Sequence, residues 1–179
     1  MVHWYIDSLD NFIFIIRLNQ YFTHYKQLNV NTKFKKIFST FIKRCLNLKD
    51  KLGLILIQLP HKFSYSEKNI NKLIQFGEFI KDKYNRIRCA FEFRNVLMFN
   101  NHIYELLKSY NFIIVANDNH TIGHKLAPSL NKYILVSKNI CIRLRGTKNI
   151  YKGKYSILEL NNLVNFIKNH ILCLNHLII

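Results

Sequence analysis

Short apolar runs recur along the chain, and each is followed by a polar residue, a loop and a stretch with helical spacing. Apolar runs of this length, punctuated by glycine and proline, are typical of buried strands. Their sequences are NFIFIIRLN (11–19), LGLILIQLP (52–60), RCAFEFRN (88–95), NFIIVANDN (111–119) and ICIRLRG (140–146). We therefore predict a strand at each run.

Between and after these runs, apolar residues recur every three or four positions, as they do on one face of a helix. The stretches with this spacing are 34–46, 70–80, 103–107 and 157–167. Strands that alternate with helices in this way indicate βα units and a parallel sheet. No linker, low-complexity segment or internal repeat interrupts the pattern, so we predict a single domain over residues 1–179.

The run RCAFEFRN shows how polar side chains are distributed on these strands. Successive side chains of a strand point to opposite faces, so Glu92 and Arg94 share one face, opposite Phe91 and Phe93. Both faces of a parallel strand are usually apolar. Polar residues confined to the carboxyl ends of strands are where α/β barrels and open α/β sheets build their functional sites.

The same alternation in the other runs gives a set of polar residues near the strand ends. The set comprises Arg17, Gln58, Glu92, Arg94, Asp118, Arg143 and Arg145. We predict an α/β fold of TIM-barrel-like parallel βα repeats, with these residues clustered at one end of the sheet. The alternative is that the opposite charges form a structural ion network that only closes the barrel interior.

Five motifs carry a resemblance to a known family. They are YFTHYKQL (21–28), LGLILIQLP (52–60), AFEFRN (90–95), ICIRLRG (140–146) and YKGKYSILEL (151–160). In this order and spacing, over most of residues 4–160, the chain resembles the YecE-like family, also called domain of unknown function seventy-two. The resemblance implies a TIM-barrel-like fold and no established reaction.

The resemblance also implies which positions match the family's motifs. The matching residues are Thr23 with His24, Gln58 with Pro60, Glu92 with Phe93 and Arg94, Arg143 with Gly146, and Tyr151 with Gly153 and Tyr155. The chain departs from the pattern at Arg145 and Asn95, which stand where the family has His, at Met98, which replaces Trp, and at Arg17, which replaces Lys.

The length predicts an incomplete barrel, because a closed eight-stranded barrel typically takes about 250 residues and this chain has 179. The resemblance implies that the sequence begins at the third strand, so we expect a family member truncated at the N-terminus, with truncation at the C-terminus left open. We expect an unclosed sheet with an unpaired edge at the strand that contains Phe12 and Phe14. The final residues, ILCLNHLII, are interpreted as a degraded eighth strand.

The predicted strand ends combine proton-transfer groups with cations. His24, Glu92 and Asp118 are the candidate general acid and base residues. Arg17, Arg94, Arg143 and Arg145 would suit a phosphate or a carboxylate, with Gln58, Tyr151 and Tyr155 beside them, although the tyrosines are equally explained as loop-packing residues. We expect Arg94 to orient Glu92. No local metal motif is present, so no metal site is predicted, and no cofactor is indicated.

The net charge of the chain suggests nucleic acid as a second kind of partner. The formal net charge is +17, which is typical of proteins that bind nucleic acid, although a coding bias towards lysine and asparagine would also produce it. The sequence thus leaves three functions open: a barrel enzyme or former enzyme acting on an anionic substrate, a non-catalytic nucleic-acid-binding protein, and an inactive remnant.

The remaining expectations concern location. No apolar run approaches the length of roughly 18 residues that a membrane span needs, so no membrane partner is predicted. The four cysteines are far apart in the sequence and read as reduced core residues, as in a cytoplasmic protein. No feature of the sequence predicts an oligomeric state.

Overall fold

The computed structural model describes residues 1–117, 139–144, 152–170 and 176–178. Within these residues, six parallel strands form one sheet in which the spatial order follows the chain order, β1 to β6. The strands are β1 (Phe14–Arg17), β2 (Leu52–Gln58), β3 (Cys89–Glu92), β4 (Ile113–Asn117), β5 (Asn139–Arg143) and β6 (His176–Ile178).

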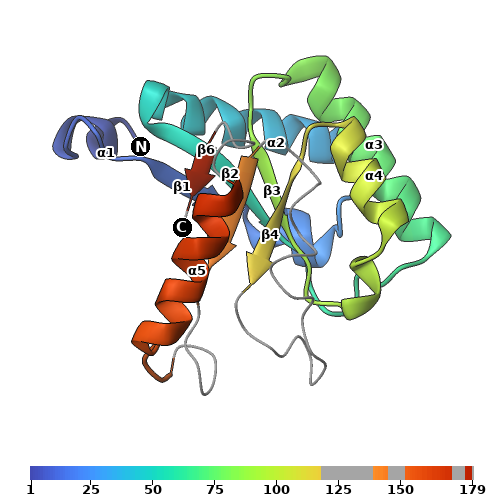
Figure 1. The fold of residues 1–179 in the computed structure, drawn as a ribbon. Helices are drawn as coiled ribbons and strands as arrows, with labels where there is room; N and C mark the ends of the chain where they lie inside the picture. The colour runs from blue at the N-terminus through green and yellow to red at the C-terminus, as the bar shows by residue number, and fades with distance from the viewer. Residues whose placement is uncertain (118–138, 145–151, 171–175, 179) are drawn as a thin grey trace.

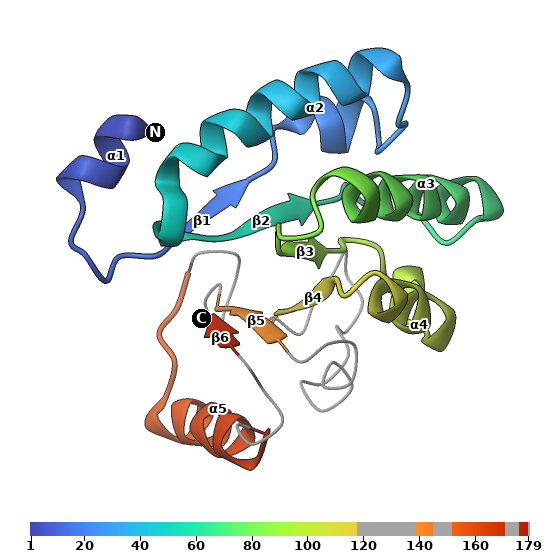
Figure 2. The same cartoon turned by 90° about the horizontal axis from the view of Figure 1, so that it is seen from above.

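Helices alternate with these strands and lie outside the curve of the sheet. The main helices are α1 (Val2–Asp7), α2 (Thr32–Cys45), α3 (Glu67–Lys83), α4 (Asn101–Ser109) and α5 (Ile157–His170). The strands follow an arc, with α2, α3, α4 and α5 around its convex side (Figures 1 and 2). This arrangement confirms the predicted α/β fold, an incomplete TIM-barrel-like sheet. Among the described residues, no helix has the length and apolar character needed to cross a membrane.

The two ends of the arc are the outer strands of the described sheet. β1 pairs with β2, and β6 pairs with β5. The predicted edge is therefore confirmed at β1, which contains Phe14, whereas Phe12 precedes the strand. The carboxyl-terminal segment expected to form a strand contains β6, while residues 171–175 and 179 lie outside the described residues.

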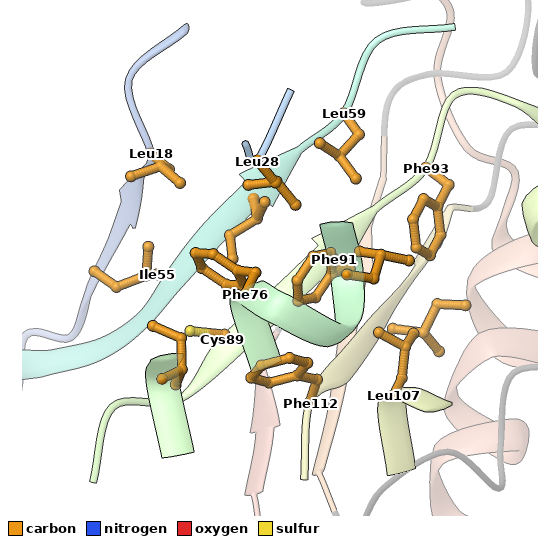
Figure 3. Close-up of a cluster of buried hydrophobic side chains, with 14 of the residues drawn as sticks. Leu18, Leu28, Ile55, Leu59, Phe76, Cys89, Phe91, Phe93, Leu107 and Phe112 are labelled. Atoms are coloured by element: carbon orange, nitrogen blue, oxygen red, sulfur yellow. The ribbon is translucent and has the colours of Figure 1, made fainter. Parts of the chain in front are cut away.

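Alternating side chains give the sheet two apolar faces. The convex face packs on the helices, where Ile55 of β2 and Phe91 of β3 lie beside Phe76 of α3 (Figure 3). The concave face carries a smaller cluster, formed by Leu54, Leu56, Ala90, Ile113, Val115 and Cys141. Both faces are therefore apolar along most of the sheet, as parallel strands require.

Three of the cysteines have the predicted core positions. Cys45, Cys89 and Cys141 are buried and free, and Cys173 lies outside the described residues. Burial raises the pKa of the Cys89 thiol to about 12, so this group stays protonated at neutral pH.

Side-chain caps explain where the helices begin. Asn31, Ser66 and Asn100 each accept a hydrogen bond from a backbone N–H in the first turn of α2, α3 and α4, respectively. At α5, Ser156 and Glu159 form a capping box: the Ser156 hydroxyl accepts from the backbone N–H of Glu159, while the Glu159 carboxylate accepts from the backbone N–H of Ser156.

A buried lysine attaches the short helix α1 to the rest of the domain. The Nζ atom of Lys51 lies 2.9 Å from the carbonyl oxygen of Tyr5 and 2.8 Å from that of Ser8. The Tyr5 ring also lies against this ammonium, at 4.8 Å from Nζ to the ring centroid. Because Lys51 is only 4% exposed, these partners replace the water contacts that its side chain has lost.

Replacing Lys51 by Met should therefore weaken the attachment of α1. We expect a loss of about 2 kcal/mol in the free energy of unfolding, because hydrogen bonds to a charged group are lost. Urea denaturation would measure this, and limited proteolysis should show earlier cleavage within residues 1–10. Lys43→Met, which changes an exposed lysine of α2, is the matched control. Equal stability of the two variants would contradict the assignment.

Candidate functional site

Polar side chains end several strands on the concave face of the sheet. Alternation places Gln58 on the same face as Leu56, Glu92 on the face of Ala90, and Arg143 on the face of Cys141. Arg17 is the last residue of β1. We call these carboxyl ends of the strands, on the concave face, the rim. The rim is where the sequence predicted the site.

The centre of the rim is a buried amide–carboxylate pair. The parallel register sets Gln58 of β2 opposite Glu92 of β3, and the Nε2 group of Gln58 donates to Oε1 of Glu92 over 2.7 Å. The two residues are 2% and 1% exposed. A buried carboxylate needs such a donor because it has lost its contact with water.

The second oxygen of Glu92 forms an ion pair with Arg143. The Nη1 group of Arg143, on β5, donates to Oε2 of Glu92, so the contact crosses β4. The sequence prediction assigned this role to Arg94, and the structure gives it to Arg143. The physical reason is that β3 ends at Glu92. Arg94 lies beyond the strand, so the rule that side chains two positions apart share a face no longer applies to it. Arg94 is exposed.

Asn117 is a rim residue that sequence analysis missed. It is the last residue of β4, lies opposite Arg143 in the register, and is 6% exposed. The prediction chose Asp118 from this run, and Asp118 lies outside the described residues. The residues before Asn117 are apolar on both faces, so the sequence alone does not show which face its side chain takes. The pairing of β4 with β5 fixes that face.

Two buried acceptors at the rim have no hydrogen-bond partner among the described residues. They are Oε1 of Gln58 and Oδ1 of Asn117. Leaving a buried amide oxygen without a donor is unfavourable, and buried polar groups in native proteins almost always have a partner. These two atoms are therefore the most unusual polar groups of the rim.

His24 lies just beyond β1, in a short π-helix, η1 (Tyr21–Tyr25). Its Nδ1 atom is 2.8 Å from the hydroxyl of the buried Thr23, which fixes the orientation of the ring. Burial lowers the pKa of His24, and the charges of Arg17, Arg94 and Lys62 lower it further. His24 is therefore uncharged at neutral pH and able to accept a proton. Lys62, which follows β2, was not predicted, because it lies in a loop with no recognisable motif.

Asn95 connects two loops beside the rim. This buried residue stands where the resembling family has His. Its Nδ2 group donates to the carbonyl of His61 over 2.8 Å, and its Oδ1 atom accepts from the backbone N–H of Leu97. The loop that carries Lys62 is thereby held to the loop that carries Arg94.

The remaining predicted site residues lie at the edge of the described structure or beyond it. Tyr155 is partly buried, whereas Arg145 and Tyr151 lie outside the described residues, as Asp118 does. In the described part of the chain, no group of three or more His, Cys, Asp or Glu side chains could hold a metal ion.

The ion pair between Arg143 and Glu92 should appear as a coupling energy between substitutions of the two residues. Arg143→Met would leave the Glu92 carboxylate buried without its cation and should cost about 3 kcal/mol, at the lower end for buried pairs because Arg143 stays partly exposed. Adding Glu92→Gln in the same chain should restore part of that stability. Urea denaturation of both single variants and the double variant measures the coupling, and additive effects would contradict the pairing.

Burial lowers the pKa of His24, and the neighbouring cations should contribute a further part of that shift. Because the folded chain disfavours the imidazolium, stability should fall as pH drops below the ordinary value of 6.5 and should not depend on this group above it. Arg94→Met should move the pKa of His24 upwards, as followed by NMR titration of the imidazole signals. The matched control is Arg86→Met, an exposed arginine in the loop before β3; an equal change in both variants would contradict the assignment.

Comparison with solved structures shows the same fold in other proteins. A DUF72 family protein from Thermotoga maritima superposes with a TM-score of 0.79 at 21% identity, covering 97% of this chain and 67% of that one. A DUF72 family protein from Enterococcus faecalis superposes with a TM-score of 0.80 at 16% identity, covering 98% of this chain and 70% of that one. About a third of each neighbour thus has no counterpart here.

Comparison with curated protein sequences gives no match. Residues 1–175 match the family described as "Protein of unknown function DUF72", in agreement with the YecE-like motifs of the sequence. The chain therefore belongs to the DUF72 family.

Proposed function

We propose that the rim binds a small anionic molecule that carries a phosphate or a carboxylate, and that the protein acts on it as an enzyme. The observation that supports this most directly is the setting of His24: burial lowers its pKa, and Arg17, Arg94 and Lys62, from three different segments, lie close enough to lower it further. Like charges gathered around one point repel one another, and a bound anion would relieve that repulsion.

The charge balance of the rim supports an anionic ligand. Among the described residues, Glu92 is paired with Arg143, so Arg17, Arg94 and Lys62 contribute an excess of positive charge. Arginine provides planar pairs of donors that match phosphate and carboxylate oxygens. Arg17 and Arg94 are both exposed, so they are accessible to a ligand from solvent.

The predicted catalytic residues Glu92 and His24 would have different roles, one in positioning Arg143 and the other in proton transfer. Both oxygens of Glu92 are engaged, one by Gln58 and one by Arg143, so Glu92 would act by holding Arg143 in place. His24, uncharged and partly exposed, is the better candidate for accepting a proton from the bound molecule. Asp118, Arg145, Tyr151 and Tyr155 remain predicted contributors to the same site.

Binding of inorganic phosphate tests the proposal without knowledge of the substrate. Arg94→Met and Arg17→Met should each weaken phosphate binding by about tenfold, because each would remove a charged hydrogen bond. Isothermal titration calorimetry measures the affinity, and Arg86→Met, at the opposite end of β3, should bind as the unchanged protein does. Equal weakening in all three variants would indicate a general charge effect and contradict a site.

Nucleic-acid binding is the second candidate, because Lys33, Lys35, Lys36 and Lys43 are all exposed on α2. Lys51, which follows α2 in the chain, is buried and does not support this function. An oligonucleotide serves as the second ligand in the same experiment. Binding that is insensitive to Arg94→Met but is lost when the α2 lysines are replaced, and that falls steeply with salt, would favour this alternative.

A further inference from the structure

We propose that Gln58 and Asn117 each accept a hydrogen bond from a hydroxyl group of the ligand, so that the bound molecule is a polyhydroxylated phosphate or carboxylate rather than a simple anion. This inference rests on the proposed anion site and specifies the class of molecule it accepts. It starts from the two buried acceptors of the rim, Oε1 of Gln58 and Oδ1 of Asn117, which have no donor among the described residues.

The orientation of Gln58 is set by its neighbour. The ionised carboxylate of Glu92 accepts hydrogen bonds and has none to donate. The Nε2 group of Gln58, which is the donor end of the amide, therefore faces Glu92 over 2.7 Å. The other atom of the same amide, Oε1, is consequently held away from Glu92. Gln58 is thus a fixed acceptor, because turning the amide over would place two oxygens against each other.

Asn117 brings the second acceptor to the same rim. It follows Val115 on the concave face of β4 and lies opposite Arg143 in the register with β5. Arg143 in turn contacts Glu92, to which Gln58 is hydrogen-bonded. The acceptors therefore stand on β2 and β4, on either side of the strand that carries Glu92, and both are more than nine-tenths buried.

A neutral donor fits these acceptors better than a cation does. Arg17, Arg94 and Lys62 already place positive charge near the rim, and Glu92 is neutralised by Arg143, so an ammonium group would meet repulsion. The described residues also provide no cluster of metal ligands. A hydroxyl donates a hydrogen bond without adding charge, while the anionic group of the same molecule meets the cations.

Such a pair would give the site selectivity. When a molecule without the hydroxyl binds, the two buried acceptors stay unsatisfied, and sites built this way discriminate strongly against the analogue that lacks the donor. The unpaired state of Gln58 and Asn117 would then be a cost in the free protein that ligand binding removes.

The test compares ligands that differ in their hydroxyl groups. In isothermal titration calorimetry, glycerol 3-phosphate should bind about tenfold more tightly than propyl phosphate, the gain expected from newly satisfied hydrogen bonds. Glycerate and propionate provide the same comparison for a carboxylate. Asn117→Leu, which keeps the size of the side chain but removes its acceptor, should reduce the preference and leave propyl phosphate binding unchanged.

A stability measurement separates recognition from a structural role. If Asn117 serves ligand binding, Asn117→Leu should melt at the same temperature as the unchanged protein or higher, because a buried unpaired oxygen is removed. If Asn117 is structural, the melting temperature should fall, which would overturn the proposal. Asn117→Ala provides the same ligand comparison if the leucine variant does not fold. Asn47→Leu, at an exposed position before β2, is the matched control.

The outcomes distinguish this inference from the proposed function. Equal binding of glycerol 3-phosphate and propyl phosphate would overturn hydroxyl recognition and leave the anion site standing. Failure of every phosphate and carboxylate to bind would overturn both. Tighter binding of 3-aminopropyl phosphate than of glycerol 3-phosphate would replace the hydroxyl by an ammonium group and overturn the inference as stated. A hydroxyl preference that Asn117→Leu reduces and Asn47→Leu retains would support it.

Discussion

The organisation of the rim depends on one buried carboxylate. Glu92 of β3 accepts from Gln58 of β2 and pairs with Arg143 of β5, so a single side chain links three strands. A charge buried to this extent is tolerated only when its partners hold it in place. Glu92 therefore determines the orientation of the Gln58 amide and the direction of the Arg143 guanidinium.

The rim contrasts with the remainder of the sheet. Below it, both faces are apolar and closely packed, with the aromatic residues of α3 and β3 at the centre of the larger cluster. A hydrophobic layer of this kind supports precise placement of the polar groups above it, because packed strands resist small displacements. Two of these polar groups, the amide oxygens of Gln58 and Asn117, have no hydrogen-bond donor in the described part of the chain.

Sequence reasoning predicted the fold well because hydrophobic periodicity and strand–helix alternation are properties of the chain itself. It also placed Gln58, Glu92 and Arg143 at the strand ends, because alternation along a strand is a local rule. It misassigned the partner of Glu92, because where a strand ends depends on pairing with its neighbours. Asn117 was missed for a related reason. Because the run before it is apolar on both faces, the sequence does not show which face of the sheet its side chain takes, and the register with β5 shows it.

The order of the sheet bears on how the rim is assembled. Because spatial order follows chain order, each strand can join the sheet beside the one that precedes it, and each pairing closes only a moderate loop. The pair between Glu92 and Arg143 is different, since it joins residues 51 positions apart and spans β4. The contact between Arg143 and Glu92 therefore requires β3, β4 and β5 to lie in place together. The geometry of the rim is thus a property of the assembled sheet and of no single βα unit.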